Sequence, residues 1–396
     1  MKIAFGGQLL LVGNKTGTAW NAHHLILELL KYSENECVIQ CFTCPMNAAQ
    51  RNRLEEYRRM GCKAECCGWF FHALYKLLWL VVPIPYQIFF HTKADVTQFF
   101  NFTVPPGVKG RRIAMIHDMA YKSCPATVRW KTRIWLELYM KRSCRHTDQI
   151  VTVSEFSKKE IVKYLHVPPE KITVVPNAVD HSVYRHDYSK KQIQEVRNRY
   201  GVEKEYFLYL GTIEPRKNLE RLLMAYEKLS EEREHVPQLV LAGGNGWMYQ
   251  GIYKRARRMK RGNKILFTGY VAPADSPVLM CGALAFVFPS LYEGFGMPPL
   301  EAMACKTPVI VSNSSSLPEV VGNAARLVNP KSVEDICAAM KEMLEQPQYR
   351  IRLGERGWQR AKAYTWEKSA KKLMELYRTG TAHSGSECEK LEGQSG

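Results

Sequence analysis

The 396-residue sequence lacks several features that would place it in other classes of protein. It has no zinc-finger, RRM or arginine-rich pattern, so nucleic acid is the least supported partner. No secretory signal pattern precedes the strand-like residues Lys2 to Phe5, and we therefore expect a cytoplasmic protein. No second C-x2-C or Cys/His pair accompanies Cys41 and Cys44, so we expect no metal site. The 12 cysteines are instead expected to be buried thiols in a reducing compartment.

The sequence also lacks an uninterrupted apolar run long enough to cross a membrane. The longest run, Trp69 to Phe90, contains His72 and Lys76. Pro83 and Pro85 cut it before it reaches the roughly 20 clean residues of a membrane-spanning helix. Two interpretations stay open. The run is either a core helix followed by a loop, or a surface helix whose aromatic residues enter the interface of an anionic membrane.

Positive charge is what the sequence has in excess. Lys and Arg number 56 against 38 Asp and Glu, a formal net charge of +18, and residues 1–185 carry more of that excess than the rest. Such a surface favours an anionic partner, either anionic lipid or a phosphorylated substrate. With 46% hydrophobic residues, the length and composition are typical of a globular enzyme of two domains.

The most informative stretch runs from Val287 to Ala304, with the sequence V-F-P-S-L-Y-E-G-F-G-M-P-P-L-E-A-M-A. The apolar strand that it completes, Ala285 to Phe288, leads into a two-glycine loop and then a helix with two prolines in its first turn. This geometry binds phosphate through backbone N–H groups, although an ordinary strand-to-helix crossover is the other interpretation. Glu293 and Glu301 flank the anion site and can hold hydroxyl groups on either side of it.

Strand-like and helix-like segments alternate along the chain. The glycine loop from Gly13 to Thr18 follows the first strand, but G-x-G-x-x-G is absent, so dinucleotide binding is not indicated. The polar stretch between Pro176 and Val202 marks a domain boundary, and the alternation begins again at Tyr206. We predict an α/β protein with two parallel sheets. The predicted parts are an N-terminal domain over residues 1–185, a C-terminal domain over 186–379 whose last helix packs back toward the first domain, and a disordered tail over 380–396.

Two further segments place charged side chains at the carboxyl ends of predicted strands, where open parallel sheets bind ligands. R-I-A-M-I-H-D ends in His117 and Asp118, and the loop T-I-E-P-R-K-N contains Arg216 and Lys217. Two cations at such a position can clamp phosphate oxygens. A structural histidine with an Asp partner, and a solvated pair of surface cations, are the alternative interpretations.

Three polar positions are interpreted as helix starts. Ser154 and Asn218 are predicted to cap the helices that follow them, and Ser316 with Glu319 is interpreted as a capping box. An amphipathic helix is expected around Trp130 to Arg142.

Five motifs in order resemble those of the retaining GT-B glycosyltransferases of family 4: H-D at 117, V-S-E-F-S at 153, V-V-P-N-A-V-D at 174, G-T-I-E-P-R-K-N-L at 211 and E-G-F-G-M-P-P-L-E-A-M-A at 293. The likeness covers nearly the whole chain. It is greatest to mannosyltransferases that build O-antigen and exopolysaccharide chains. It implies two Rossmann-like domains that face each other across a cleft.

The resemblance also implies an activity. A sugar, with mannose from GDP-mannose as the first choice, is transferred to a glycan acceptor on a lipid diphosphate carrier. UDP- and dTDP-sugars remain alternative donors. The protein is then expected on the inner face of the membrane, as a peripheral protein.

Individual residues acquire roles by the same resemblance. Arg216 and Lys217 neutralise the donor diphosphate, and Glu301 accepts the ribose hydroxyls. Glu293 holds hydroxyls of the transferred sugar, and His117 approaches that sugar from the other domain. The other donor-binding residues that it implies are Gly17, Gly211, Gly294, Phe295, Gly296 and Met297. No metal or other cofactor is expected, because two cations and a helix N-terminus can stabilise the leaving diphosphate.

Some positions depart from the family pattern. Lys306 stands in A-C-K-T-P where the family usually has glycine, and Pro277 falls where it is expected to shorten or kink a helix. The loop from Gly13 to Thr18 lacks the commoner T-G-I-G run. A nucleotide-sugar epimerase or hydrolase and a non-catalytic polysaccharide-binding scaffold are the rival functions, and the complete set of charged site residues argues against both.

Overall fold

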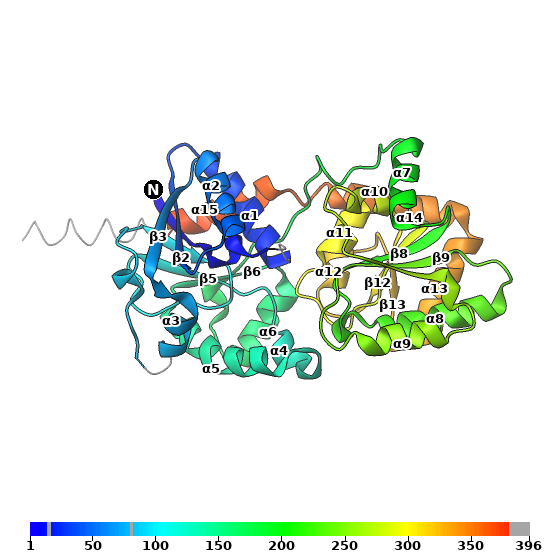
Figure 1. The fold of residues 1–396 in the computed structure, drawn as a ribbon, viewed down its shortest axis with the longest axis horizontal. Helices are drawn as coiled ribbons and strands as arrows, with labels where there is room; N and C mark the ends of the chain where they lie inside the picture. The colour runs from blue at the N-terminus through cyan, green and yellow to red at the C-terminus, as the bar shows by residue number, and fades with distance from the viewer. Residues whose placement is uncertain (14–16, 80–81, 380–396) are drawn as a thin grey trace, which may run out of the picture. The chain divides into compact units, whose positions relative to one another are not determined.

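The computed structural model describes residues 1–13, 17–79 and 82–379. Residues 380–396, for which a disordered tail is predicted, lie outside the described residues. Packing divides the chain into two compact units. Unit 1 contains Met1–Met119, Trp130–Asn177 and the segment from Trp366 onward, and unit 2 contains Ala120–Arg129 and Ala178–Thr365. Each unit is built on its own sheet (Figure 1).

The sheet of unit 1 consists of parallel strands in the order β3-β2-β1-β4-β5-β6-β7 among the described residues. The strands are β1 (Lys2–Gly6), β2 (Glu36–Cys44), β3 (Lys63–Phe71), β4 (Val96–Phe99), β5 (Arg111–Met115), β6 (Gln149–Thr152) and β7 (Ile172–Val174). All four residues of β4 are buried, as expected for a strand covered on both faces. The strand order reverses between β1 and β4. Such a reversal point is where open α/β sheets bind ligands.

Helices cover this sheet on both sides. They are α1 (Gly17–Leu30), α2 (Ala48–Arg59), α3 (His72–Leu78), α5 (Trp130–His146), α6 (Glu155–Leu165) and α15 (Trp366–Thr379). The last helix, α15, packs against α1, where the rings of Trp366 and His24 stack at 4.9 Å. Its buried residues Leu373, Met374 and Tyr377 have the three- and four-residue spacing of one helix face. The final helix is therefore part of unit 1.

The sheet of unit 2 is also parallel, in the order β10-β9-β8-β11-β12-β13. Its strands are β8 (Tyr206–Leu210), β9 (Gln238–Ala242), β10 (Ile265–Gly269), β11 (Ala285–Phe288), β12 (Val309–Ser312) and β13 (Arg326–Val328). The strand order reverses between β8 and β11. These are the two strands that precede the cationic loop and the glycine loop.

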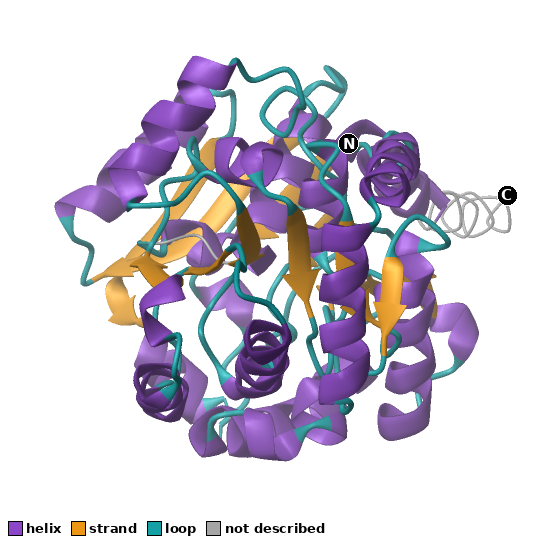
Figure 2. Ribbon diagram, turned by 90° about the vertical axis from the view of Figure 1, so that its right-hand side faces the viewer, coloured by secondary structure: helices purple, strands orange, loops and turns teal. Residues whose placement is uncertain are grey.

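Helices enclose the strands of unit 2 on both faces, which Figure 2 shows with strands in orange and helices in purple. One group contains α8, α9 and α13, and the other contains α7, α10, α11 and α14. The bounds are α4 (Ala120–Ser123), α7 (Lys190–Tyr200), α8 (Leu219–Glu232), α9 (Gln250–Arg258), α10 (Ser276–Gly282), α11 (Met297–Ala304), α12 (Leu317–Val321), α13 (Val333–Glu345) and α14 (Pro347–Ala361).

The three predicted helix starts have different outcomes. The Ser154 hydroxyl accepts a hydrogen bond from the backbone N–H of Ser157, so this cap is confirmed. Asn218 occupies the N-cap position of α8, but its amide donates to the carbonyls of Pro289 and Pro330 instead of capping the helix. The capping box at Ser316 is wrong, because this hydroxyl donates to the carbonyls of Glu293 and Phe295. In both failures a long-range partner replaces the local one.

Three other expectations are also decided by the structure. Residues 69–71 belong to β3 and not to a helix, because the strand pairs with β2 as far as Phe71. Pro277 neither kinks nor interrupts α10, since it lies in the first turn, where its missing N–H costs nothing. Lys306 does adopt the left-handed conformation, with φ of 60°, that glycine usually occupies. Among the described residues, no helix is both long and apolar enough to cross a bilayer.

Candidate active site

The candidate site lies at the reversal point of the unit 2 sheet. β8 and β11 are neighbours there, and the loops that follow them are joined by hydrogen bonds. The carbonyl of Arg216 accepts from the backbone N–H of Leu291 at 2.9 Å and from the hydroxyl of Ser290 at 3.2 Å. The cationic loop and the glycine loop, 70 residues and more apart in the sequence, therefore form one structure.

A four-residue ionic cluster is the centre of this structure, and we define it as Glu214, Arg216, Lys217 and Glu293. Lys217 Nζ donates to Glu293 Oε1 at 2.6 Å. Arg216 bridges both carboxylates, with Nη1 at 2.9 Å from Glu293 Oε2 and Nη2 at 2.8 Å from Glu214 Oε1. The hydroxyl of Ser290 also donates to Glu293 Oε1. Arg216 and Lys217 are thus not a solvated surface pair.

Burial makes these charges strongly interdependent. Lys217 is 8% exposed and Glu293 is 7% exposed. Burial alone raises the pKa of Glu293, but the charges of Arg216 and Lys217 outweigh it and bring the pKa to about 2. The carboxylate is therefore ionised at neutral pH. Two cations and two carboxylates give the cluster a formal charge of zero, so loss of either cation leaves it negative.

The occupied lone pairs of Glu293 restrict what else it can bind. Oε1 accepts from both Lys217 and Ser290, which fills its two acceptor positions. Oε2 accepts from Arg216 and keeps one acceptor position. The geometry therefore suits Glu293 to accept one hydroxyl hydrogen bond from a ligand.

The N-terminus of α11 adds backbone donors beside the cluster. Within residues 1–13, 17–79 and 82–379, the N–H groups of Phe295, Gly296 and Met297 hydrogen-bond to no acceptor. The next two residues are prolines and have no N–H to offer. Gly296 has φ of 107°, and a Cβ there would lie 2.5 Å from Leu317. The left-handed backbone and this close approach both favour glycine, and the loop presents unbonded N–H groups at the start of α11, while anion binding by them stays a prediction.

Glu301 lies one turn inside α11 and differs from Glu293 in its charge state. Burial raises its pKa to about 7, and a hydrogen bond with Tyr184 opposes this only in part. The structure therefore contains one carboxylate that is always ionised at neutral pH and another that titrates near neutrality.

The raised pKa of Glu301 predicts pH-dependent nucleotide binding. If the ionised carboxylate accepts the ribose hydroxyls, binding favours the deprotonated form. Affinity then holds above pH 7 and falls by about tenfold from pH 8 to pH 6, because the ionised fraction falls in that proportion. Titration of the protein with nucleoside diphosphate at several pH values measures this change. Glu301→Gln should remove the dependence and Glu231→Gln, on the exposed face of α8, should keep it. A dependence that survives Glu301→Gln would contradict the assigned role.

Gly211 directly follows β8, where two neighbouring loops approach closely. A Cβ on Gly243, which directly follows β9 and has φ of 142°, would lie 1.9 Å from the carbonyl oxygen of Gly211. Gly211 itself donates its N–H to the carbonyl of Ala242. The described contacts give these glycines a packing role in holding the loops together.

Two residues with predicted roles, His117 and Gly17, belong to unit 1. His117 follows β5, is 6% exposed, and its Nε2 lies 2.9 Å from the carbonyl oxygen of Phe100. Burial lowers its pKa, while Phe100 and Asp118 act in the opposite direction. Gly17 begins α1, and the preceding residues 14–16 of the glycine loop lie outside the described residues. The roles of both residues toward a ligand stay predictions.

Sequence reasoning missed Glu214, Ser290 and Tyr184, which hold the charged residues in place. Glu214 is 3% exposed and lies in the motif T-I-E-P-R-K. A carboxylate so close to two cations in the sequence could have indicated an ion pair. No local pattern distinguishes Ser290 or Tyr184. The residues that the structure describes contain no group of three or more His, Cys, Asp or Glu arranged to hold a metal ion.

Comparison with known families agrees with this architecture. The model of the glycosyl transferases group 1 family matches residues 190–360, and that of glycosyltransferase family 4 matches residues 34–183. Among solved structures, sucrose-phosphate synthase from Thermosynechococcus elongatus superposes with a TM-score of 0.73 at 18% identity. That match covers 97% of this chain and 100% of the other. The two family models and the two parallel sheets thus define a glycosyltransferase of the GT-B fold.

Curated relatives support the same assignment. O-antigen chain mannosyltransferase B of Escherichia coli is 35% identical over 283 residues, which cover 70% of this chain and 72% of that protein. The serotype-specific mannosyltransferase WbdA of Escherichia coli is 31% identical over 249 residues, or 60% of this chain, and the chain spans only 30% of its length. The chain belongs to the group 1 glycosyltransferases, as its motif order predicts.

Proposed function

We propose that this glycosyltransferase moves mannose from GDP-mannose, with retention of configuration, to a lipid-linked glycan in the synthesis of a cell-surface polysaccharide. Mannose as the transferred sugar is supported by relatives at 30% identity or more that are named mannosyltransferases. Retention follows the family that the sequence motifs resemble.

The ionic cluster beside α11 is the observation that carries this proposal. Transfer breaks the bond between the sugar and the diphosphate, so negative charge develops on the leaving diphosphate. Arg216 and Lys217 and the free N–H groups of residues 295–297 are donors of the kind that stabilise such charge. The remaining acceptor position of Glu293 Oε2 takes a hydroxyl of the sugar. No metal ion enters this mechanism.

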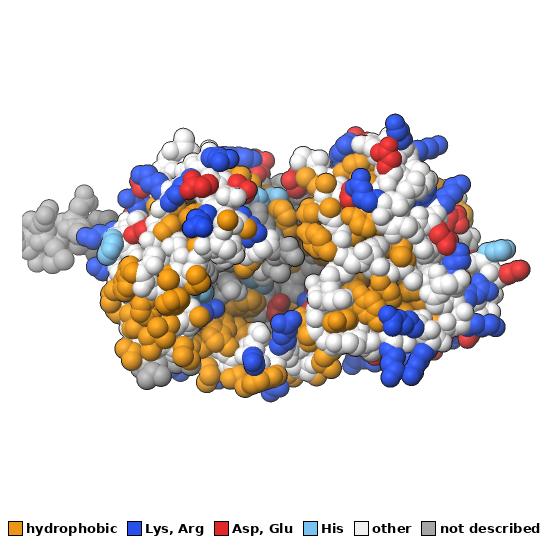
Figure 3. Space-filling view, viewed as in Figure 1, with side chains coloured by type: hydrophobic (Ala, Val, Ile, Leu, Met, Phe, Trp, Pro, Cys, Tyr) orange, Lys and Arg blue, Asp and Glu red, His pale blue; other side chains and the backbone are white. Residues whose placement is uncertain are grey.

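Contact with an anionic membrane is the second part of the proposal. Among the described residues, nine of the sixteen exposed large hydrophobic side chains belong to two stretches of unit 1, residues 69–88 and 130–138. We call these residues the apolar face: Trp69, Phe71, Leu74, Leu77, Val82, Ile88, Trp130, Ile134 and Leu138. In Figure 3 orange side chains gather over the part of unit 1 that holds β3, α3 and α5.

The charge next to the apolar face favours a lipid surface over another apolar partner. Trp130, Ile134 and Leu138 are spaced four residues apart on α5, and exposed Lys131, Arg133 and Lys141 belong to the same helix. A helix with exposed aromatic and aliphatic side chains and several cations is suited to an anionic membrane interface.

Nucleotide binding tests the donor. Purified protein is heated with GDP, UDP, ADP or dTDP, with and without EDTA. A nucleotide at 100 times its Kd should raise Tm by about 5 °C or more, because it stabilises only the folded state. We expect this shift with GDP alone and no effect of EDTA. Transfer of labelled mannose from GDP-mannose to a membrane lipid extract then checks the reaction.

Three other results would change the assigned donor, the absence of a metal ion, or the class of donor. A shift with UDP or dTDP would replace the donor and keep the site. Loss of the shift in EDTA would require a metal ion. No shift with any nucleotide would contradict the use of a nucleotide-sugar donor.

A further inference from the structure

Unit 1 has a concave region of its own, apart from the ionic cluster of unit 2. A groove of about 670 Å³ lies between α3 and α5, and a smaller cavity of about 80 Å³ lies deeper in the unit. Lys76 and Asn101 line both of them. The groove and the inner cavity therefore adjoin at these two residues.

The inner cavity lies at the reversal point of the unit 1 sheet. Gly6 and Gly7 come from the end of β1, and Phe100 and Asn101 follow β4, which is the neighbouring strand across the reversal. Open α/β sheets bind ligands at this point because the chain leaves adjacent strands in opposite directions there. The ionic cluster of unit 2 lies at the reversal point of its own sheet. By the same rule, the reversal point of the unit 1 sheet is a candidate binding site.

The groove suits an apolar chain. Its volume is within the range of small-molecule sites, and most of its lining is hydrophobic. Leu77, Ile134 and Leu138 contribute to it and are also members of the apolar face. An apolar chain in this groove would thus remain continuous with the surface that we propose to meet the membrane.

The walls of the groove are held by aromatic contacts. Tyr139 donates its hydroxyl to the carbonyl of Lys76 at 2.5 Å, which joins α5 to α3. The rings of Tyr139 and Trp135 stack at 4.8 Å, and Tyr139 meets Trp79 edge to face at 5.2 Å. The groove is therefore a formed feature of the fold.

Lys76 is a partly buried cation that lines both the groove and the inner cavity. Its ammonium lies over the ring of Trp135, 4.4 Å from the centroid, and in the described part of the chain it forms no ion pair. Burial lowers its pKa. No Asp or Glu is among the described residues that line the groove or the inner cavity, whereas Lys131 lines the groove as a second cation. A partly buried cation without a carboxylate favours an anionic ligand.

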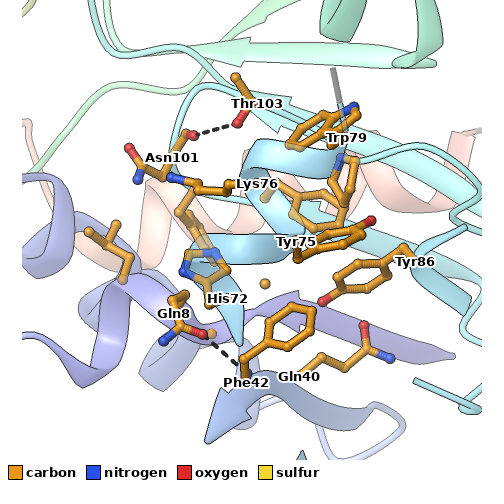
Figure 4. A pocket seen from close by; sticks show the side chains of 16 residues that line it. Gln8, Gln40, Phe42, His72, Tyr75, Lys76, Trp79, Tyr86, Asn101 and Thr103 are labelled. Carbon is orange, nitrogen blue, oxygen red and sulfur yellow. Dashed lines mark hydrogen bonds between the residues drawn. The ribbon is translucent and has the colours of Figure 1, made fainter. Parts of the chain in front are cut away.

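The size of the inner cavity limits what can enter it. A water molecule needs roughly 10–15 Å³ of such volume, so 80 Å³ accommodates a few waters or one small polar group. Figure 4 shows the Lys76 side chain extending toward Asn101, with His72 below it and the rings of Tyr75 and Tyr86 to its right. Burial and the charge of Lys76 lower the pKa of His72 to about 4, so the ring is neutral and can donate one hydrogen bond.

We propose that the α3–α5 groove binds the hydrocarbon chain of a lipid phosphate and that Lys76 binds the phosphate at the entrance to the inner cavity. That this lipid phosphate is the carrier of the sugar acceptor rests on the proposed function. A nucleotide suits the groove poorly, because a base and a ribose need more polar partners than its lining offers.

Calorimetric titration of the full chain with farnesyl phosphate, farnesol and inorganic phosphate tests the site. Farnesyl phosphate should bind about tenfold more tightly than farnesol, because a charge-assisted hydrogen bond is added to the same apolar contact. Inorganic phosphate should show no saturable binding to the protein. Lys76→Met should remove the tenfold preference, and Lys93→Met, at an exposed lysine of the same unit, should keep it. Equal affinity for farnesol and farnesyl phosphate in the unaltered protein would overturn the proposal.

A groove variant tests the apolar part separately. Ile134→Asp places a carboxylate in the groove and should weaken farnesol and farnesyl phosphate alike by about tenfold. Because Ile134 is half exposed, at 51%, this change should leave the fold intact, and an unchanged Tm would verify that. Unchanged farnesol binding in Ile134→Asp would place the chain elsewhere and contradict the groove.

Sedimentation with vesicles separates a specific lipid phosphate from a general anionic surface. The unaltered protein should sediment with phosphatidylglycerol vesicles more than with phosphatidylcholine vesicles. Lys76→Met should sediment as the unaltered protein does, since Lys76 lies in the groove and is mostly covered. Parallel loss of vesicle binding and farnesyl phosphate binding would show a general headgroup site and overturn the proposal.

Nucleotide binding and lipid phosphate binding are expected to be independent of each other. Lys76→Met should retain the GDP-induced rise in Tm, because the ionic cluster belongs to unit 2. If no nucleotide shifts Tm in the unaltered protein, the donor proposal fails, and the titration with farnesyl phosphate still decides the groove.

Discussion

Replacing Lys217 with alanine is expected to lower the rate of sugar transfer by about 10²–10³-fold, which is typical when one preorganised donor to a developing charge is removed. The formal charge of the cluster changes from zero to −1, and the leaving diphosphate loses one of the two cations proposed to stabilise it. Steady-state rates with saturating donor and acceptor measure the loss.

The stability of the Lys217→Ala protein needs a parallel measurement. Removing one partner of a buried ion pair costs on the order of 3–5 kcal/mol, because the other charge stays buried. Arg216 and Ser290 still contact Glu293 and should limit that cost.

Lys228→Ala, at a cation of α8 whose nearest ion-pair distance is 3.8 Å, is the control and should retain full activity. Lys217→Arg keeps the charge and should recover part of the rate.

Turnover that is unchanged in a folded Lys217→Ala protein would refute the mechanism. It would mean that the diphosphate is stabilised by other groups. A loss of activity that is matched by unfolding in the same buffer would be resolved by the Lys217→Arg protein.

Replacing Gly296 with alanine is expected to weaken nucleotide binding by about tenfold or more. The added Cβ meets the Cδ2 atom of the buried Leu317 side chain at 2.5 Å, so we expect the loop before α11 to shift and to carry its N–H groups away from the anion. The left-handed backbone, with φ of 107°, adds strain of about 1–3 kcal/mol for a residue with a side chain. Titration with the nucleoside diphosphate that stabilises the protein gives the affinity, and thermal unfolding gives the strain.

Gly61 provides a matched control for this experiment. It has nearly the same backbone conformation, with φ of 101°, but no atom lies within 4 Å of its Cβ position. Gly61→Ala should therefore lose only the stability that the left-handed backbone costs and should leave nucleotide affinity unaltered. Equal affinities in the two alanine variants would show that the position of the α11 N-terminus does not determine binding.

Most of the strands and helices could be predicted because their signals are local. Apolar strands that end in glycine or proline, such as Ala285–Phe288, are recognisable from neighbouring residues alone. The start of α11 is another such case, since two prolines in a first turn are compatible with a helix and with little else.

The errors occur where a long-range partner outcompetes a local one. Ser316 has the sequence spacing of a capping box, yet its hydroxyl binds the glycine loop more than 20 residues away. The apolar run that starts at Trp69 was interpreted as a helix. Pairing with β2 instead extends β3 as far as Phe71. Such outcomes depend on which elements meet, and local propensity contains no information about that.

The candidate site divides in the same way. Arg216, Lys217, Glu293 and Glu301 were identifiable because each lies in a motif at the end of a strand. Their pairing was not, because it depends on β8 and β11 being neighbours although β9 and β10 separate them in the sequence. The different pKa values of the two glutamates were also beyond prediction, since burial and the distance to a cation set each pKa.

By itself, therefore, the sequence determined the fold class, the family motifs and the residue types available for chemistry, because these depend on local order along the chain. The tertiary structure alone decided that four charged residues form one neutral cluster, that Glu301 titrates near neutrality, and that Lys76 lies at the junction of a groove and a cavity. The reason is physical: hydrogen bonding, desolvation and charge pairing act between atoms that are close in space, and strand order brings those atoms together.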